Sequence, residues 1–155
     1  MKNSSISGNN FTGAAEQHHA TVAVAQNSKL TMLNSTIAGN TAMNMIYTAT
    51  NGSVALLNTT IASNIGTGVR VDAGASFTAV NAIIAYNRIS GAYSDMFFGS
   101  ASDVTLVSSV VGNYAFGSAT IADATQVTYG ATVDTSSALF ASYDTTAGYM
   151  MPVIS

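Results

Sequence analysis

One segment of the chain recurs about every 25 residues, and this repeat constrains the fold more than any other sequence feature. Leu30–Asn40 (LTMLNSTIAGN) returns as Val54–Asn64 (VALLNTTIASN) and again as Phe77–Asn87 (FTAVNAIIAYN). A fainter copy covers Val107–Asn113, and a half copy opens the chain at Asn3–Asn9. Repetition at a fixed spacing of about 20–50 residues indicates one supersecondary unit stacked on itself.

The repeats predict strands. Val, Ile and Thr are frequent, and turn residues such as Asn51-Gly52 leave runs too short for helices. Each repeat has room for about three short strands, which must pair in parallel with the next repeat at about 4.8 Å. We therefore expect an all-β, parallel β-helix (β-solenoid) of about five rungs of roughly 23–31 residues. It should occupy residues 1–129, and residues 130–155 should form an irregular closing segment of the same domain.

Stacking places equivalent residues in columns, and these columns explain the motif. We expect a buried aliphatic ladder formed by Ile6, Ile37, Ile61, Ile84 and Val110. We expect an asparagine ladder at one corner, formed by Asn9, Asn40, Asn64, Asn87 and Asn113. A second asparagine column, Asn3, Asn34, Asn58 and Asn81, should stop at Val107. An asparagine at a corner can bond its own turn and the asparagine of the adjacent rung.

Composition excludes several classes of function. The chain has no cysteine, so disulfides and thiolate metal sites are excluded. Its net charge of -3, with four basic residues, argues against a nucleic-acid partner. No apolar run approaches the roughly 18 residues of a membrane span, and Met1-Lys2 precedes polar residues instead of a signal sequence. Only 7% of residues are charged, a composition more common in secreted and surface repeat proteins.

The rungs of the form strand, Asn-Ser-Thr-Ile-x-Gly-Asn resemble those of bacterial right-handed parallel β-helix proteins of the cell-surface, adhesin type. The order of Asn81–Asn87, Asp95 and Ser109–Asn113 is similar to the way that family ends its helix. The segment Ala138-Leu139-Phe140, with Asp144, Gly148-Tyr149 and Pro152, is similar to its closing segment. This resemblance implies a right-handed helix and an extracellular or cell-surface location. It implies no activity, because the same solenoid serves adhesins and polysaccharide enzymes.

An enzyme of the polysaccharide lyase or hydrolase type is the alternative. Such enzymes need clustered carboxylates, usually beside Arg or Lys. The seven acidic residues are scattered, and the nearest approach to a cluster is Arg70 with Asp72, then Arg88 with Asp95. The pair His18-His19 points to opposite faces if it lies in a strand, so a metal site is not expected. We assign no catalytic residue, metal or cofactor.

Candidate ligand or partner residues lie where the repeat breaks. Aromatic residues such as Tyr47 and Tyr86 could make a carbohydrate platform, although packing beneath a loop is the favoured interpretation for any one of them. The candidates are Phe11, His18, His19, Arg70, Asp72, Arg88, Tyr93, Asp95, Phe97 and Phe98.

We expect a non-enzymatic structural or adhesive module of an exported bacterial surface protein. Its partners would be surface glycans or itself, because the ends of a solenoid expose unpaired strand edges unless they are capped. Copies could then associate end to end into oligomers or fibres.

Overall fold

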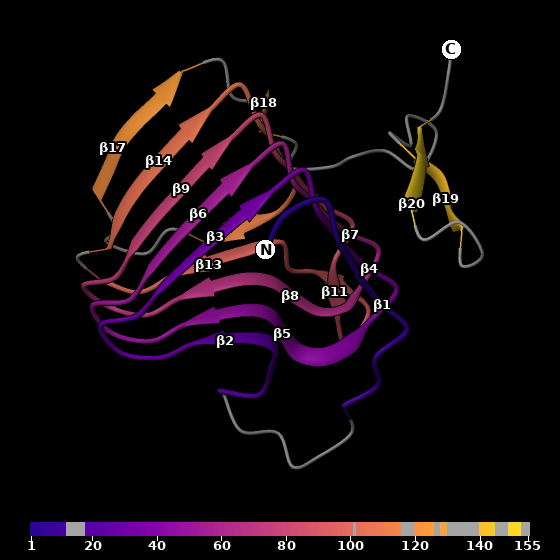
Figure 1. The fold of residues 1–155 in the computed structure, drawn as a ribbon, viewed down its shortest axis with the longest axis horizontal. Helices are drawn as coiled ribbons and strands as arrows, with labels where there is room; N and C mark the ends of the chain where they lie inside the picture. The colour runs from indigo at the N-terminus through magenta and orange to yellow at the C-terminus, as the bar shows by residue number, and fades with distance from the viewer. Residues whose placement is uncertain are drawn as a thin grey trace.

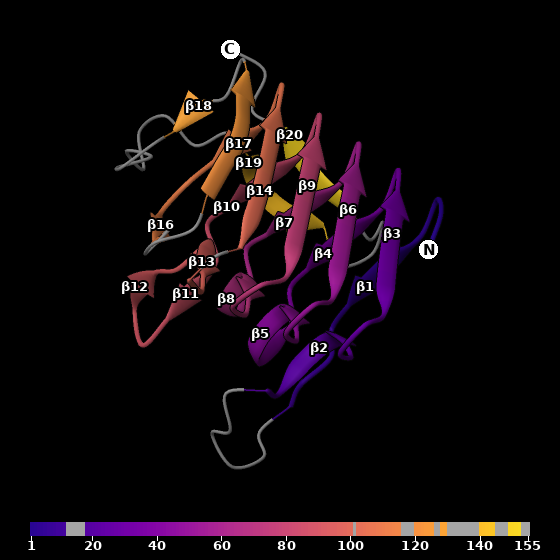
Figure 2. The ribbon, with the colours of Figure 1, turned by 90° about the vertical axis from the view of Figure 1, so that its left-hand side faces the viewer.

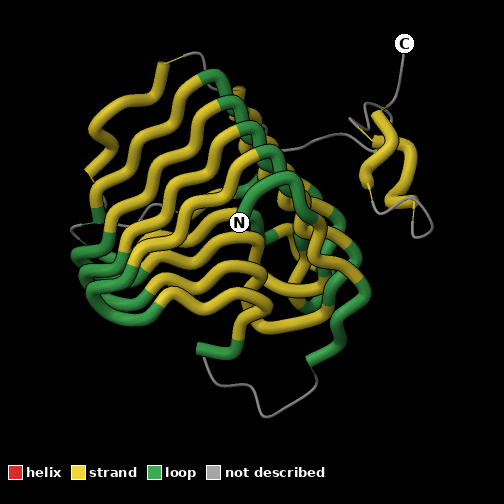
Figure 3. Tube along the Cα trace, viewed as in Figure 1, coloured by secondary structure: helices red, strands yellow, loops and turns green. Residues whose placement is uncertain are grey.

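The structure is a computed structural model that describes residues 1–11, 18–100, 102–115, 120–125, 128–129, 140–144 and 149–152. All elements in these residues are strands, and parallel strands stack in about four turns of a β-solenoid (Figures 1 and 3). The expected fold class is confirmed, with slightly fewer turns than predicted. Within the described residues, no helix is long and apolar enough to cross a membrane.

Three parallel sheets form the walls of the solenoid. Sheet A contains β3 (Lys29–Leu33), β6 (Ser53–Leu57), β9 (Ser76–Val80), β14 (Asp103–Val107) and β17 (Thr120–Thr125), which lie side by side in Figure 2. Sheet B contains β1 (Ser5–Ser7), β4 (Thr36–Ala38), β7 (Thr60–Ala62), β10 (Ile83–Ala85), β15 (Val110–Val111) and β18 (Thr128–Tyr129). Sheet C contains β2 (Ala20–Val24), β5 (Thr41–Thr48), β8 (Ile65–Val71), β13 (Met96–Phe98) and β16 (Tyr114–Ala115).

Two hairpins leave this regular pattern. Strands β11 (Arg88–Ile89) and β12 (Ala92–Tyr93) pair antiparallel and form an excursion between β10 and β13. Strands β19 (Phe140–Asp144) and β20 (Tyr149–Pro152) form a second antiparallel hairpin, and β20 lies beside β4. Most of residues 130–155 lie outside the described residues, so their closing role stays a prediction.

The core follows from alternation within each strand. In β6 and β9, alternate side chains point inward and are buried, whereas their neighbours face the surface. Phe77 of sheet A meets Phe98 of sheet C edge to face, with ring centres 5.5 Å apart, so the sheets share one interior. Phe98 is only 1% exposed. Its prediction as a partner-facing loop residue is therefore wrong.

The aliphatic ladder is confirmed for four of its five members. The strand register aligns Ile6, Ile37, Ile61 and Ile84. The next partner of Ile84 is Val111, because Val110 pairs with Ile83 on the outward side. The prediction of Val110 is therefore wrong by one residue. A one-residue slip moves a strand side chain to the opposite face, and Val111 is the buried member.

This register predicts unequal effects for two adjacent valines. Val111→Ala should lower the free energy of unfolding by about 2 kcal/mol, because it leaves a cavity in the core. Val110→Ala, on the outward face, should change it by less than about 1 kcal/mol. Urea denaturation of both variants measures the difference. A larger loss at Val110 would contradict the observed register.

Candidate functional site

The predicted corner ladder is a directional chain of hydrogen bonds. The side-chain Nδ2 of Asn9 donates to Oδ1 of Asn40 at 3.0 Å, Asn40 donates to Asn64 at 3.1 Å, and Asn64 donates to Asn87 at 2.7 Å. Each Nδ2 also donates to the carbonyl oxygen two residues earlier in its own rung. A carbonyl oxygen accepts hydrogen bonds but cannot donate them, so the Nδ2 end of each side-chain amide must face it. This requirement fixes the orientation of every amide in the ladder.

Asp95 ends this ladder. Its Oδ1 accepts the backbone N–H and the side-chain Nδ2–H of Asn87, both at 2.8 Å. Its Oδ2 accepts the backbone N–H of Asn113, again at 2.8 Å. The prediction that Asn113 continues the ladder directly from Asn87 is therefore wrong. The physical reason is the β11–β12 excursion, which returns the chain at Asp95 and inserts its carboxylate between the two asparagines.

The Asp95 carboxylate lies in the interior. It is only 1% exposed, and this burial raises the pKa of Asp95 above the ordinary value, although its three N–H donors act in the opposite direction. A Cβ atom on Gly112 would collide with the Asp95 carboxylate, so only glycine fits beside it. Asp95 is therefore a structural end point of the ladder, and its prediction as a ligand- or partner-facing residue is wrong.

The second asparagine column runs along the outside of the adjacent corner. Asn34 donates to Asn3, Asn58 to Asn34, and Asn81 to Asn58, at 3.0, 3.0 and 2.8 Å. These residues have φ between 48° and 53°, a left-handed conformation that asparagine tolerates better than most residues. The column ends at Ser108, because Val107 pairs with Val80. The predicted end at Val107 is therefore wrong by one residue.

The outward face of sheet C brings together three predicted site residues, Arg70, Asp72 and Phe97, and adds Tyr47 to them. Tyr47 of β5, Arg70 of β8 and Phe97 of β13 are register partners and form one column. Asp72 follows β8 and accepts a hydrogen bond from the Tyr47 hydroxyl at 2.6 Å. We call Tyr47, Arg70, Asp72 and Phe97 the sheet C strip.

Charged and aromatic groups contact each other along the sheet C strip. Arg70 Nε donates to Asp72 Oδ1 at 3.4 Å, and both side chains are about one-quarter exposed. The Arg70 guanidinium carbon lies 5.1 Å from the centre of the Phe97 ring, within the range of a cation–π contact. Phe97 itself is 41% exposed. The strip therefore offers an aromatic ring beside an oriented ion pair.

The environment of Tyr47 shows what this strip can do chemically. Burial, followed by the hydrogen bond to Asp72 and the charge of that carboxylate, raises the pKa of Tyr47 from 10.0 to about 12, although Arg70 acts in the opposite direction. Tyr47 consequently remains a protonated donor at neutral pH. Both oxygens of Asp72 already accept hydrogen bonds, one from Tyr47 and one from Arg70. This arrangement suits binding better than proton transfer.

The other candidates do not join the strip as one cluster. His18 meets the Tyr47 ring edge to face, with ring centres 4.9 Å apart, and so lies at the margin of the sheet C strip. His19 instead contacts Phe11, with ring centres 4.8 Å apart. Arg88 lines a separate hollow with Ile65 and Tyr86, among others. Tyr93 pairs with Arg88 in the β11–β12 hairpin. Within the described residues, no three His, Asp or Glu side chains could hold a metal ion together.

Sequence reasoning named Arg70, Asp72 and Phe97 but did not place Tyr47 in their column. The signal was available in the spacing, because Tyr47, Arg70 and Phe97 follow one another at roughly the repeat length. The buried position of Asp95 had no comparable signal, since an excursion of unknown length precedes it.

No protein-family model matches the chain, and comparisons with curated proteins and with solved structures give no significant match.

The Asp95 geometry predicts that removing its charge destabilises the protein. In Asp95→Asn, an amide N–H replaces an acceptor oxygen and faces a donor N–H of Asn87 or Asn113. Leaving a buried donor unsatisfied should lower the free energy of unfolding by about 1–3 kcal/mol at pH 7. Asp103→Asn, on an exposed residue, is the matched control and should change it by less than about 0.5 kcal/mol.

The same pair of proteins tests the direction of the pKa shift. Because the folded-state pKa of Asp95 is raised, the native protein binds this proton more tightly than the unfolded chain does. The wild type should therefore gain stability relative to Asp95→Asn as the pH falls from above the raised pKa towards the unfolded value. Denaturation at several pH values measures the difference in free energy of unfolding between the two proteins. A difference in stability that moves against the wild type as the pH falls over this range would contradict the raised pKa.

Proposed function

We propose that this chain is a non-enzymatic, adhesive β-solenoid module of an exported bacterial surface protein, and that the sheet C strip binds surface saccharides. The observation that supports the proposal most strongly is the strip itself, in which an exposed aromatic ring lies beside a hydrogen-bonded Arg–Asp pair. The low content of charged residues supports the exported location, because Ser, Thr and Asn provide most of the polar surface.

The strip matches the two kinds of surface that a sugar ring presents. A sugar has an apolar face of C–H groups, which can pack on an exposed aromatic ring such as Phe97. Its rim carries hydroxyl groups. These can donate hydrogen bonds to a carboxylate such as that of Asp72 and accept hydrogen bonds from a guanidinium such as that of Arg70. The positive charge of Arg70 and the negative charge of Asp72 offset each other. The strip is therefore suited to a neutral saccharide more than to a negatively charged uronic acid polymer.

The strip is also held in a rigid position. Tyr47, Arg70 and Phe97 project from three adjacent strands of one parallel sheet, so the spacing between them is set by the backbone ladder. Tyr47 is 7% exposed, and its hydroxyl fixes one oxygen of Asp72. Groups that are oriented before binding lose less entropy when a ligand arrives. This arrangement favours a preformed binding surface.

Saccharide binding can be tested with matched phenylalanine variants. A panel of immobilised neutral and uronic oligosaccharides should first identify a neutral ligand, and calorimetry should then measure its affinity. Phe97→Ala should weaken binding about tenfold or more, because it removes the packing surface for the sugar. Phe11→Ala is the control, since Phe11 is also exposed but lies away from the strip, and should leave the affinity unchanged.

The same preparation separates the proposal from its enzymatic alternative. Incubation with uronic acid polymers, with and without Ca²⁺, should give no turnover. Absence of binding to the whole panel, or equal losses in the two phenylalanine variants, would contradict the adhesive proposal. Turnover that disappears in Asp72→Ala would instead establish a polysaccharide-active enzyme.

A further inference from the structure

A hollow at the corner between sheets B and C has features that the fold alone does not explain. It has a volume of about 280 Å³ and is lined by Ser63, Asn64, Ile65, Tyr86 and Arg88, which we call the corner hollow. The lining comes from two adjacent rungs, since Ile65 of β8 is the register partner of Arg88 of β11. The Asn64 amide is bonded within the asparagine ladder, so a ligand would meet chiefly Ile65, Tyr86 and Arg88.

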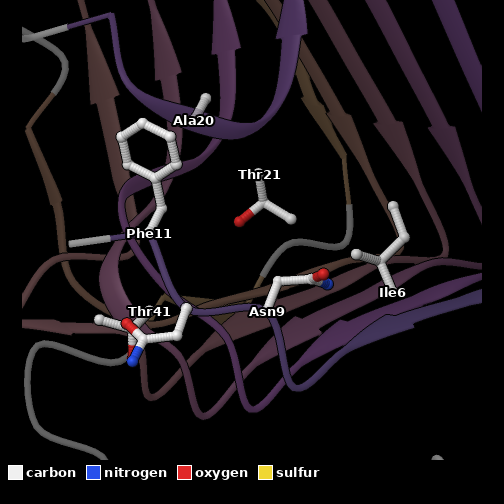
Figure 4. Close-up of a pocket in the computed structure, with 7 residues that line it drawn as sticks. Ile6, Asn9, Phe11, Ala20, Thr21 and Thr41 are labelled. Atoms are coloured by element: carbon white, nitrogen blue, oxygen red, sulfur yellow. The ribbon is translucent and has the colours of Figure 1, made fainter. Parts of the chain in front are cut away.

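Ile65 places an aliphatic side chain in solvent at this corner. It is 63% exposed, more than Phe97 of the sheet C strip at 41%. The register makes Thr41 the equivalent residue of the preceding rung, and Figure 4 shows Thr41 in the wall of another hollow. Because threonine occupies the same strand position there, the fold does not require an aliphatic side chain at Ile65.

Tyr86 has a backbone conformation that tyrosine rarely adopts. Its φ is 63°, in the left-handed region, where a bulky side chain is strained. The same position in the earlier rungs holds Gly8, Gly39 and Ser63, with φ between 55° and 67°. Glycine adopts this conformation without a steric penalty. Strain of this kind clusters at ligand-binding sites, which favours a role for the Tyr86 side chain outside the fold.

The lining combines an apolar wall with hydrogen-bond donors, as small-molecule sites usually do. Ile65 and the ring of Tyr86 provide carbon surface. Arg88 is exposed, and a guanidinium carries five N–H donors and no acceptor, so the ligand group beside it has to accept hydrogen bonds. The corner hollow is therefore suited to a group in which a methyl lies next to a carbonyl oxygen. An acetamido group has this arrangement.

We propose that the corner hollow binds the acetamido group of an N-acetylated sugar, with its methyl against Ile65 and Tyr86 and its oxygen towards Arg88. This inference rests on the proposed function, because it takes a neutral saccharide as the ligand and adds the N-acetyl substituent. Ile65 begins β8 and Arg70 of the sheet C strip lies near the end of the same strand, so one oligosaccharide along this strand can reach both. A carboxylate would also accept from Arg88, but it has no methyl for Ile65.

NMR of isoleucine methyl groups tests the corner hollow without involving the strip. Titration of the full chain with N-acetylglucosamine or N-acetylgalactosamine should shift the methyl signals of Ile65, and those of the buried Ile37 and Ile61 should stay in place. Glucose, which lacks the acetamido group, should shift none of them. Absence of a shift at Ile65 with both N-acetylated sugars would overturn the inference. Equal shifts with glucuronic acid would also overturn it, because they would indicate recognition of a carboxylate.

Two variants that restore residues of earlier rungs test the roles of the side chains. Ile65→Thr and Tyr86→Gly should each weaken binding of an N-acetylated oligosaccharide about tenfold, because each removes part of the apolar wall. Neither should lower the urea midpoint, since Thr41 and Gly39 occupy these positions in an earlier rung. Unchanged affinity in Ile65→Thr would overturn the inference. A lower midpoint for Tyr86→Gly would also do so, because it would give the tyrosine a structural role.

Ile83→Thr is the matched control for the loss of an isoleucine. Ile83 faces outward in sheet B, its register partner in the preceding rung is Thr60, and it does not line the corner hollow. This variant should bind like the wild type. An equal loss of affinity in Ile83→Thr and Ile65→Thr would contradict a specific contact at the hollow.

Failure of this inference can be distinguished from failure of the proposed function. Calorimetry compares an N-acetylated oligosaccharide with its counterpart that carries hydroxyl groups in place of the acetamido groups. If both bind equally and Phe97→Ala weakens both, the corner hollow fails and the sheet C strip stands. If Phe97→Ala has no effect while N-acetylated sugars still shift Ile65, the strip fails and the hollow stands.

Discussion

The hydrogen-bonded ladder of corner asparagines is the interaction on which the rest of the structure depends. Each interior asparagine satisfies backbone groups of its own rung and joins that rung to the next. A buried polar group without a partner costs about 1–3 kcal/mol, so a corner of this kind is stable only when the whole column is satisfied. The repeat spacing, the register of the three sheets and the polarity of the solenoid all follow from this requirement.

A directional ladder needs a distinct group at each end. At the C-terminal end that group is the Asp95 carboxylate, which only accepts hydrogen bonds and so receives donors from both sides. Three N–H groups offset part of the cost of burying its charge, and Gly112 leaves the room that the carboxylate needs. At the other end of the described ladder, Asn9 donates to Asn40 and to its own rung. The ladder therefore has one chemical direction, with the donor of each bond on the N-terminal side and the acceptor on the C-terminal side.

Much of the fold could be predicted because each rung repeats the same local chemistry. The identity of the columns followed from spacing alone for Ile6, Ile37, Ile61 and Ile84. Prediction failed where the spacing changed. The β11–β12 excursion makes the fourth interval irregular, and a change of one residue placed Val110 where Val111 lies. The same excursion concealed Asp95, since no sequence rule says which residue of a loop returns to the ladder.

The candidate site was less predictable than the fold. Arg70 and Asp72 are near neighbours in the sequence, so their proximity was visible, but Phe97 and Tyr47 join them only through the parallel register of sheet C. Phe97 and Phe98 are adjacent and chemically alike, yet one faces outward and the other fills the core. Strand alternation separates such residues, and it can be applied only after the exact strand start is known.

The most direct test of the ladder compares asparagines from its two columns by chemical denaturation. Asn64→Ala removes the centre of the interior ladder. It leaves the backbone N–H of Asn40 without its acceptor and removes the donor that serves three buried oxygens, so it should lower the free energy of unfolding by about 3 kcal/mol or more. Asn58→Gly, which retains the left-handed backbone of the exposed column, should cost less than about 1 kcal/mol. Equal losses in the two variants would contradict the central role of the interior ladder.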